Sequence, residues 1–125
     1  MNENELSYLI RGAIFKVYNA LGPGLLESAY EAALAYELAD LELLVAKQVP
    51  VPMIYNSVKL EAGYRIDILV NNMIILEIKS VENLTEVHHK QVLTYLRLAN
   101  IKLGLLINFN VSDISTGIFR KVNRL

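Results

Sequence analysis

Hydrophobic residues recur at helical spacing over two stretches near the start of the chain, residues 4–20 and 25–42. Apolar side chains three or four positions apart fall on one face of a helix. The segment Gly22-Pro23-Gly24 separates the two stretches, so two helices are expected before any strand. The expected apolar faces are Leu6, Leu9, Ile10, Ala13, Ile14 and Val17, and then Leu26, Ala29, Tyr30, Ala33, Leu34 and Leu38.

The pattern then changes to strands. Apolar residues over 44–54 predict a first strand, and the two prolines within it indicate a sheet edge or a bulge. After a short turn, residues 58–70 predict a second strand. The pair Asn71-Asn72 favours a tight hairpin turn into a third strand over 73–79, which is apolar enough to be central.

Helical spacing returns over 84–99, with Val92, Leu93, Leu96 and Ala99 as the expected core side. Residues 102–109 predict a buried strand, and a short strand is expected over 116–122. The order α-α-β-β-β-α-β predicts an α/β (α+β) fold with a mixed central sheet flanked by helices. A length of 125 residues favours a single domain over 1–125.

Composition excludes several classes. With 54% hydrophobic residues the chain is too apolar for intrinsic disorder, and without cysteine it has no disulfide or cysteine nucleophile. No apolar run approaches the ~18 residues of a membrane span. The acidic, polar start does not resemble a secretory signal. A cytoplasmic protein without membrane contact is expected.

The net charge of −1 argues against a bulk polyanion binder. The charges are uneven, however, because residues 1–62 carry a net −4 and residues 63–125 a net +3. A nearly neutral total therefore accommodates a mildly basic face, to which Arg120, Lys121 and Arg124 would belong. Ordinary scatter of solvated charges explains the asymmetry equally well.

Three charged residues lie within apolar strands: Asp67, Glu77 and Lys79. Side chains alternate along a strand, so Glu77 and Lys79 share a face. A hairpin turn at Asn71-Asn72 would place Asp67 nearly opposite Glu77, and two like charges in that relation are destabilising. A divalent cation would offset them, since Mg²⁺ prefers carboxylate oxygens. A structural ion-pair cluster at the sheet margin is the alternative.

Two motifs carry a family resemblance. Asp67, followed across a hairpin by Glu77-Ile78-Lys79, resembles the D…ExK motif of the PD-(D/E)xK nuclease superfamily, and the element order is similar to its restriction-endonuclease-like core. The segment from Gly24 to Tyr30 matches the pattern GxxExxY, which names a small family placed within that superfamily. The resemblance covers nearly the whole chain.

A third motif lies on the helix over 84–99. Gln91 and Tyr95 match the QxxxY pattern of RecB-like nucleases, and their spacing places both on one helical face, with His88 on the same stripe. A helix with a polar flank explains these residues equally well. The side chain of His89 points about 100° around the helix from that of His88, and it is expected to pack or lie at the surface.

The resemblance implies a site that binds Mg²⁺ or Mn²⁺. Its metal ligands would be Asp67, Glu77, the Ile78 carbonyl and Glu27. For Glu27 a stabilising interaction with the helix dipole is the alternative. Lys79 would remain cationic beside the two carboxylates and stabilise developing charge.

The remaining residues would complete the site: Gln91 as a catalytic residue, and Arg65, His88 and Tyr95 as substrate contacts. The predicted function is metal-dependent hydrolysis of a phosphodiester in a nucleic acid, with DNA as the expected substrate. One alternative is a non-catalytic module of the same fold that binds nucleic acid or a protein partner. Another is an oligomeric regulatory subunit. A homodimer is expected because the chain is small and apolar.

Overall fold

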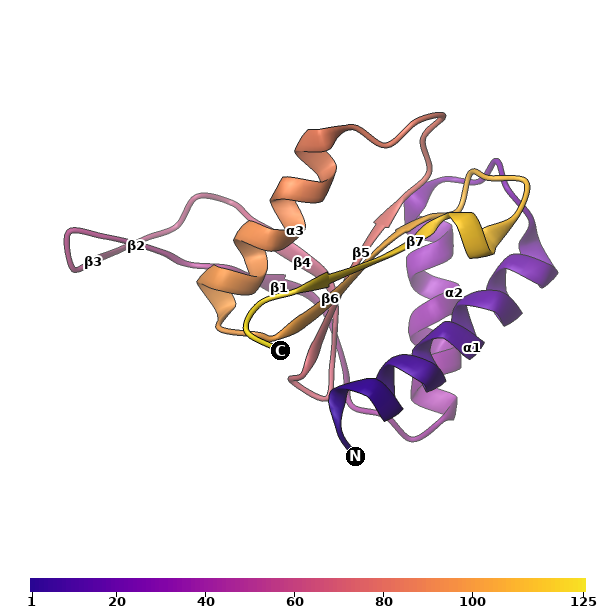
Figure 1. The fold of residues 1–125 in the computed structure, drawn as a ribbon, viewed down its shortest axis with the longest axis horizontal. Helices are drawn as coiled ribbons and strands as arrows, with labels where there is room; N and C mark the ends of the chain where they lie inside the picture. The colour runs from indigo at the N-terminus through magenta and orange to yellow at the C-terminus, as the bar shows by residue number, and fades with distance from the viewer.

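A central sheet with helices on both faces organises the protein (Figure 1). The structure is a computed structural model that describes residues 1–125. Helices α1 (Glu3–Leu21) and α2 (Glu27–Asp40) pack against one face of the sheet and α3 (Glu86–Ala99) against the other. The strands are β1 (Val45–Pro50), β2 (Met53–Tyr55), β3 (Val58–Leu60), β4 (Arg65–Val70), β5 (Ile74–Lys79), β6 (Leu103–Asn108) and β7 (Ile118–Val122), with a 3₁₀ turn, η1 (Ile114–Thr116), before β7.

The main sheet has the strand order β1-β4-β5-β6-β7. The β5–β6 pair is parallel and its connection contains α3, whereas the other pairs are antiparallel. This mixed sheet confirms the predicted fold class. The central position of β5 and the edge position of β1, which ends at Pro50, are confirmed as well.

Two apolar clusters hold the layers together. The larger lies between the sheet and the pair α1 and α2, and the smaller lies under α3. All of β6, and all of β5 except its last residue, is buried. Strands covered on both faces explain why these two segments have nearly continuous apolar sequences.

The turn at Asn71-Asn72 has the expected geometry. Both residues have positive φ values, 52° and 54°, and the Met73 amide donates to the Val70 carbonyl at 2.9 Å, as in a tight turn. Because Val70 pairs with Ile74, the connection has three residues, 71–73, one more than a two-residue hairpin loop. Asparagine tolerates positive φ better than most residues.

The predicted second strand over 58–70 is wrong as a single element. It divides into β3 and β4, separated by an irregular segment that contains Gly63 at a φ of 76°. Strands β2 and β3 form a separate two-stranded sheet, which projects away from the main sheet (Figure 1). We call this hairpin, residues 53–60, the arm.

Some expected core positions are also wrong. Leu26 precedes α2 and is 78% exposed, and Ala29 is exposed as well. On α3, Leu93 is exposed while Tyr95 is buried, because the helix turns its Val92–Tyr95–Leu96 stripe toward the sheet. None of the three helices combines the length and apolarity that crossing a membrane requires.

Candidate active site

Asp67 and Glu77 lie where strands β4 and β5 part. At the end of the β4–β5 pairing that is farthest from the turn, the last paired residues are Ile68 and Leu76. The same register places Asp67 opposite Glu77. Here the carboxylates bond across the gap. The Asp67 amide donates to Glu77 Oε1 at 3.1 Å, and the Ile78 amide donates to Asp67 Oδ2 at 2.8 Å. Each carboxylate therefore binds the backbone of the opposite strand.

Strand β4 changes face at Asp67. Ile66 belongs to the cluster under α3, whereas Ile68 belongs to the cluster under α1 and α2. Residues two apart on a regular strand share a face, so the strand must be irregular between them. Opposite Asp67, on β1, Gln48 has a positive φ of 52°. The irregularity turns the Asp67 side chain toward α2.

Gln48 is a site residue that the sequence analysis missed. Its Nε2 donates to Glu31 Oε1 at 2.7 Å and to Asp67 Oδ1 at 3.4 Å. The amide therefore lies between two carboxylates, one on α2 and one on β4. A solvent-facing glutamine on an edge strand carries no local signal for this role.

Burial and like charge act together on the carboxylate pair. Glu77 is only 3% exposed, and burial, followed by the charge of Asp67, raises its pKa to about 8. Burial also raises the pKa of Asp67, and the charge of Lys79 opposes the shift in both groups. One cationic side chain thus compensates the pair only in part.

Glu27 lies beside this pair. It is the first residue of α2, and its Oε2 accepts a hydrogen bond from the Ser80 amide at 3.1 Å, just beyond the end of β5. Ser80 Oγ also donates to the Leu25 carbonyl at 2.6 Å. Glu27, Asp67 and Ile78 line one hollow of about 220 Å³, together with Ser28, Glu31 and Gln48.

The glycine and tyrosine of the GxxExxY segment position this loop. Gly24 has a φ of 99°, a conformation that favours glycine. The Tyr30 hydroxyl donates to the Gly22 carbonyl at 2.5 Å and accepts from the Leu25 amide at 3.1 Å. Its buried ring stacks on Phe109 at 4.3 Å. Gly24 and Tyr30 thus fix the conformation of the loop that precedes Glu27.

Lys79 is the last residue of β5, and a hydrogen bond holds its backbone in place. Its carbonyl accepts a hydrogen bond from the Phe109 amide at 2.9 Å. Buried Asn108 then binds both backbone groups of Val81, at 3.1 and 2.9 Å. These bonds fix the path of the chain directly after Lys79.

Helix α3 turns two of its motif residues toward the site. Gln91 Nε2 donates to the Tyr95 hydroxyl at 3.1 Å. Burial, followed by the charges of Glu77 and Asp67, raises the pKa of Tyr95 to about 12. The carboxylates therefore act electrostatically on this hydroxyl.

The two histidines have structural contacts. His88 Nδ1 accepts the Thr85 amide at 3.1 Å and caps α3, so only its Nε2 is left for another partner. The His89 ring meets Phe119 edge-on at 5.0 Å, as its expected packing role implies. The imidazoles thus have different surroundings.

Apart from Lys79, the basic residues singled out in the sequence are not gathered around the carboxylates. Arg65 lines a neighbouring hollow with Lys59 and Tyr64. Arg120 donates to Asn4 at the start of α1 at 2.9 Å, and the next residue along β7 points to the other face of the sheet. The suggested C-terminal track is therefore not a continuous stripe.

The donor set fits a hard divalent cation. Asp67, Glu77 and Glu27 supply carboxylate oxygens, the ligand type that Mg²⁺ prefers. A buried pair of like charges with raised pKa values is what an added positive charge would stabilise. No three acidic or histidine side chains form a preassembled metal cluster, so binding would require the carboxylates to draw together.

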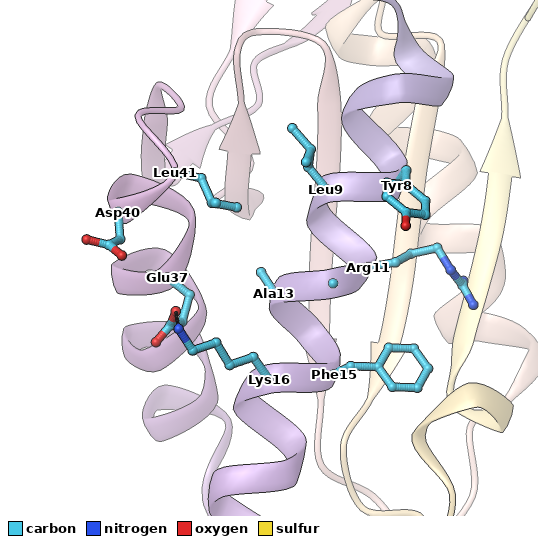
Figure 2. Close-up of a pocket in the computed structure, with 10 residues that line it drawn as sticks. Tyr8, Leu9, Arg11, Ala13, Phe15, Lys16, Glu37, Asp40 and Leu41 are labelled. Carbon is cyan, nitrogen blue, oxygen red and sulfur yellow. Dashed lines mark ion pairs between the residues drawn. The ribbon is translucent and has the colours of Figure 1, made fainter.

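A second hollow, of about 530 Å³, lies against α1 and α2 (Figure 2). Lys16 and Glu37 form an ion pair of 3.0 Å across it. None of the motif residues lines it. Asp67 and Glu77 lie outside this hollow, near the start of β4 and the end of β5.

Residues 4–121 match the model of the PD-(D/E)XK nuclease superfamily. Since this match covers nearly the whole chain, the protein belongs to that superfamily. Its members have a nuclease-like fold that implies nucleic-acid binding, and they generally use divalent metals. Comparisons with curated proteins and with solved structures found no match.

Proposed function

We propose that the protein is a metal-dependent phosphodiester hydrolase that acts on nucleic acid, with DNA as its substrate. The carrying observation is the Asp67–Glu77 pair, in which two carboxylates face one another where β4 and β5 separate. Lys79 lies two residues beyond Glu77 on β5, and its positive charge lowers the pKa of both carboxyl groups. This combination provides metal-binding oxygens and a cation in one place.

Asp67, Glu77 and the Ile78 carbonyl would hold Mg²⁺ or Mn²⁺, and Glu27 would complete the ligand set. The shared hollow of Glu27, Asp67 and Ile78 supports this assignment. When bound, the ion lowers the pKa of a coordinated water and offsets charge on the phosphate.

The chain's own side chains do the rest. Lys79 stabilises negative charge that develops on the phosphate, a role suited to a compact ammonium. Gln91, oriented by the Tyr95 hydroxyl, positions the attacking water. Arg65 and the exposed side of His88 contact the nucleic-acid backbone, and Tyr95 contacts the substrate beside the carboxylates.

The protein is a GxxExxY family member, in which Gly24 and Tyr30 fix the loop that presents Glu27. Residues 1–125 act as one domain. Because a core of this size has little surface for reading sequence, a homodimer or a protein partner supplies selectivity.

A non-catalytic module that binds nucleic acid is the second candidate. It is favoured by the absence of a preassembled three-ligand cluster and by the backbone bonds that the carboxylates already make. In that case the carboxylates would stabilise the strand ends and carry no metal. The two candidates differ in whether cleavage depends on Asp67.

The deciding experiment incubates the protein with end-labelled single-stranded and duplex DNA and RNA, in Mg²⁺, Mn²⁺ or EDTA. Wild type is compared with Asp67→Asn and Lys79→Met, and with Asp113→Asn as a matched control far along the chain. We expect cleavage with either metal, none in EDTA, and at least a 100-fold loss in the first two variants. Cleavage that survives EDTA or Asp67→Asn would contradict the proposal.

A further inference from the structure

The base of the arm forms a separate hollow next to the candidate site. It measures about 320 Å³ and is lined by Lys59 of the arm and by residues of the segments that enter and leave the arm, among them Pro50, Pro52, Tyr64 and Arg65. The arm's own strands are largely exposed and lie outside both apolar clusters. The hollow therefore lies at the base of the hairpin, which projects away from the main sheet (Figure 1).

Tyr64 provides this hollow with an aromatic ring, and a hydrogen bond holds the backbone of Tyr64 in place. Its carbonyl accepts the amide of Val51, a buried residue, at 2.9 Å. The ring lies 5.9 Å from that of Tyr95 at a tilt of 57°, yet 43% of Tyr64 is exposed. With Tyr95 on one side and solvent on the other, the ring can receive a second flat partner. An exposed aromatic face accepts any nucleobase by stacking.

The hollow also has a small excess of positive charge. Lys59 and Arg65 line it together with one acidic residue, Glu61. Neither cation forms an ion pair, since the protein's two salt bridges involve other residues. Arginine and lysine are the side chains that contact phosphate oxygens, arginine through paired N–H groups.

The hollow adjoins the candidate active site along the chain, although the two hollows share no lining residue. Arg65 precedes Asp67 by two residues, about 7 Å along the chain. On the other side, the ring of Tyr64 contacts Tyr95, whose hydroxyl is bonded to Gln91. Tyr64 is thus linked through Tyr95 to Gln91, which the proposed function places at the substrate.

We propose that this hollow holds one unpaired nucleotide of a single-stranded nucleic acid, with Tyr64 stacking on its base and Lys59 and Arg65 contacting its phosphates. A single strand is required because the faces of a base within a duplex are already stacked on its neighbours. The position of this nucleotide beside the cleaved bond rests on the proposed function, whereas the binding itself does not.

Binding is measured by fluorescence anisotropy in EDTA, so that cleavage does not contribute. The probes are labelled single-stranded DNA, single-stranded RNA and a DNA duplex of the same sequence. The variants are Tyr64→Ala and Tyr64→Phe, with Tyr55→Ala as the matched control. Tyr55 lies on the arm with similar exposure, 53%, but does not line the hollow.

Loss of the stacking ring is expected to weaken single-strand binding by about 5- to 100-fold, with duplex binding nearly unchanged. Tyr64→Phe and Tyr55→Ala should retain the wild-type affinity. Lys59→Ala should reduce the slope of log affinity against log salt by about one contact. The DNA and RNA probes show whether the sugar contributes, and tight binding of either one supports the proposal.

Three results would overturn it: no binding of any single strand, equal losses in Tyr64→Ala and Tyr55→Ala, or an equal loss for the duplex. Thermal melting of each variant excludes unfolding as the cause, and Tyr64→Phe remains informative if Tyr64→Ala does not fold. Parallel cleavage assays in Mn²⁺ keep the two proposals apart. Tyr64-dependent binding without cleavage would contradict the nuclease function alone.

Discussion

Replacing Glu77 by glutamine should change how the stability of the metal-free protein depends on pH. The Glu77 carboxyl is 3% exposed, and its pKa is raised to about 8 by burial and by Asp67. A group whose pKa is higher in the folded state favours folding while protonated. Its contribution is complete below its unfolded pKa, near 4.5, and is lost as pH rises to about 8.

The magnitude follows from linkage. One pKa unit corresponds to about 1.4 kcal/mol, so the wild type should lose about 1.4 kcal/mol of unfolding free energy per pH unit across this window. The raised pKa of Asp67 changes stability in the same direction. The total of several kcal/mol is a large part of the stability of a small domain. Glutamine keeps the shape of the side chain without the ionisation.

The assay is urea unfolding in EDTA at a series of pH values from 5 to 8. Glu77→Gln should become more stable relative to wild type at each step toward pH 8. Glu82→Gln, the same exchange at an exposed position, reports the effect of the substitution itself. A difference between Glu77→Gln and wild type that stays constant across this range would refute the reasoning.

Three other substitutions test separate parts of the structure. Lys79→Met should keep Mn²⁺ binding, measured by calorimetry, while cleavage falls at least 100-fold, because the lysine stabilises charge and is not a ligand. Tyr30→Phe should lower the free energy of unfolding by about 1–2 kcal/mol in urea, since it loses two hydrogen bonds to the loop before α2 but keeps its ring stack. Gly117→Ala should lower it by at least about 1–3 kcal/mol, because the new Cβ would lie 2.4 Å from the Asn108 carbonyl oxygen; an unchanged urea midpoint would contradict that overlap.

The sequence predicts the sheet well where local signals are strong. Strand β6 is confirmed because a strand covered on both faces must be apolar throughout. The turn at Asn71-Asn72 is confirmed because few residues other than asparagine and glycine adopt positive φ readily. The turn joins β4 to β5 and so fixes their register, which places Asp67 opposite Glu77.

Contacts between residues far apart in the chain could not be predicted from the sequence. The division of residues 58–70 depends on the arm leaving the main sheet. The contacts of Gln48 with Glu31 and Asp67 join three separate elements, and Ser80 binds Glu27 across 53 positions. Neither Gln48 nor Ser80 stands in an unusual sequence pattern. Their positions depend on how α2 packs against the sheet.

We expect Asp67 and Glu77 to form a divalent cation site. Anomalous scattering from crystals soaked in Mn²⁺ tests it most directly. We predict one strong peak in contact with oxygens of Asp67 and Glu77, beside Glu27 and the Ile78 carbonyl. Absence of a peak there, at a Mn²⁺ concentration that supports cleavage in solution, would contradict the claim.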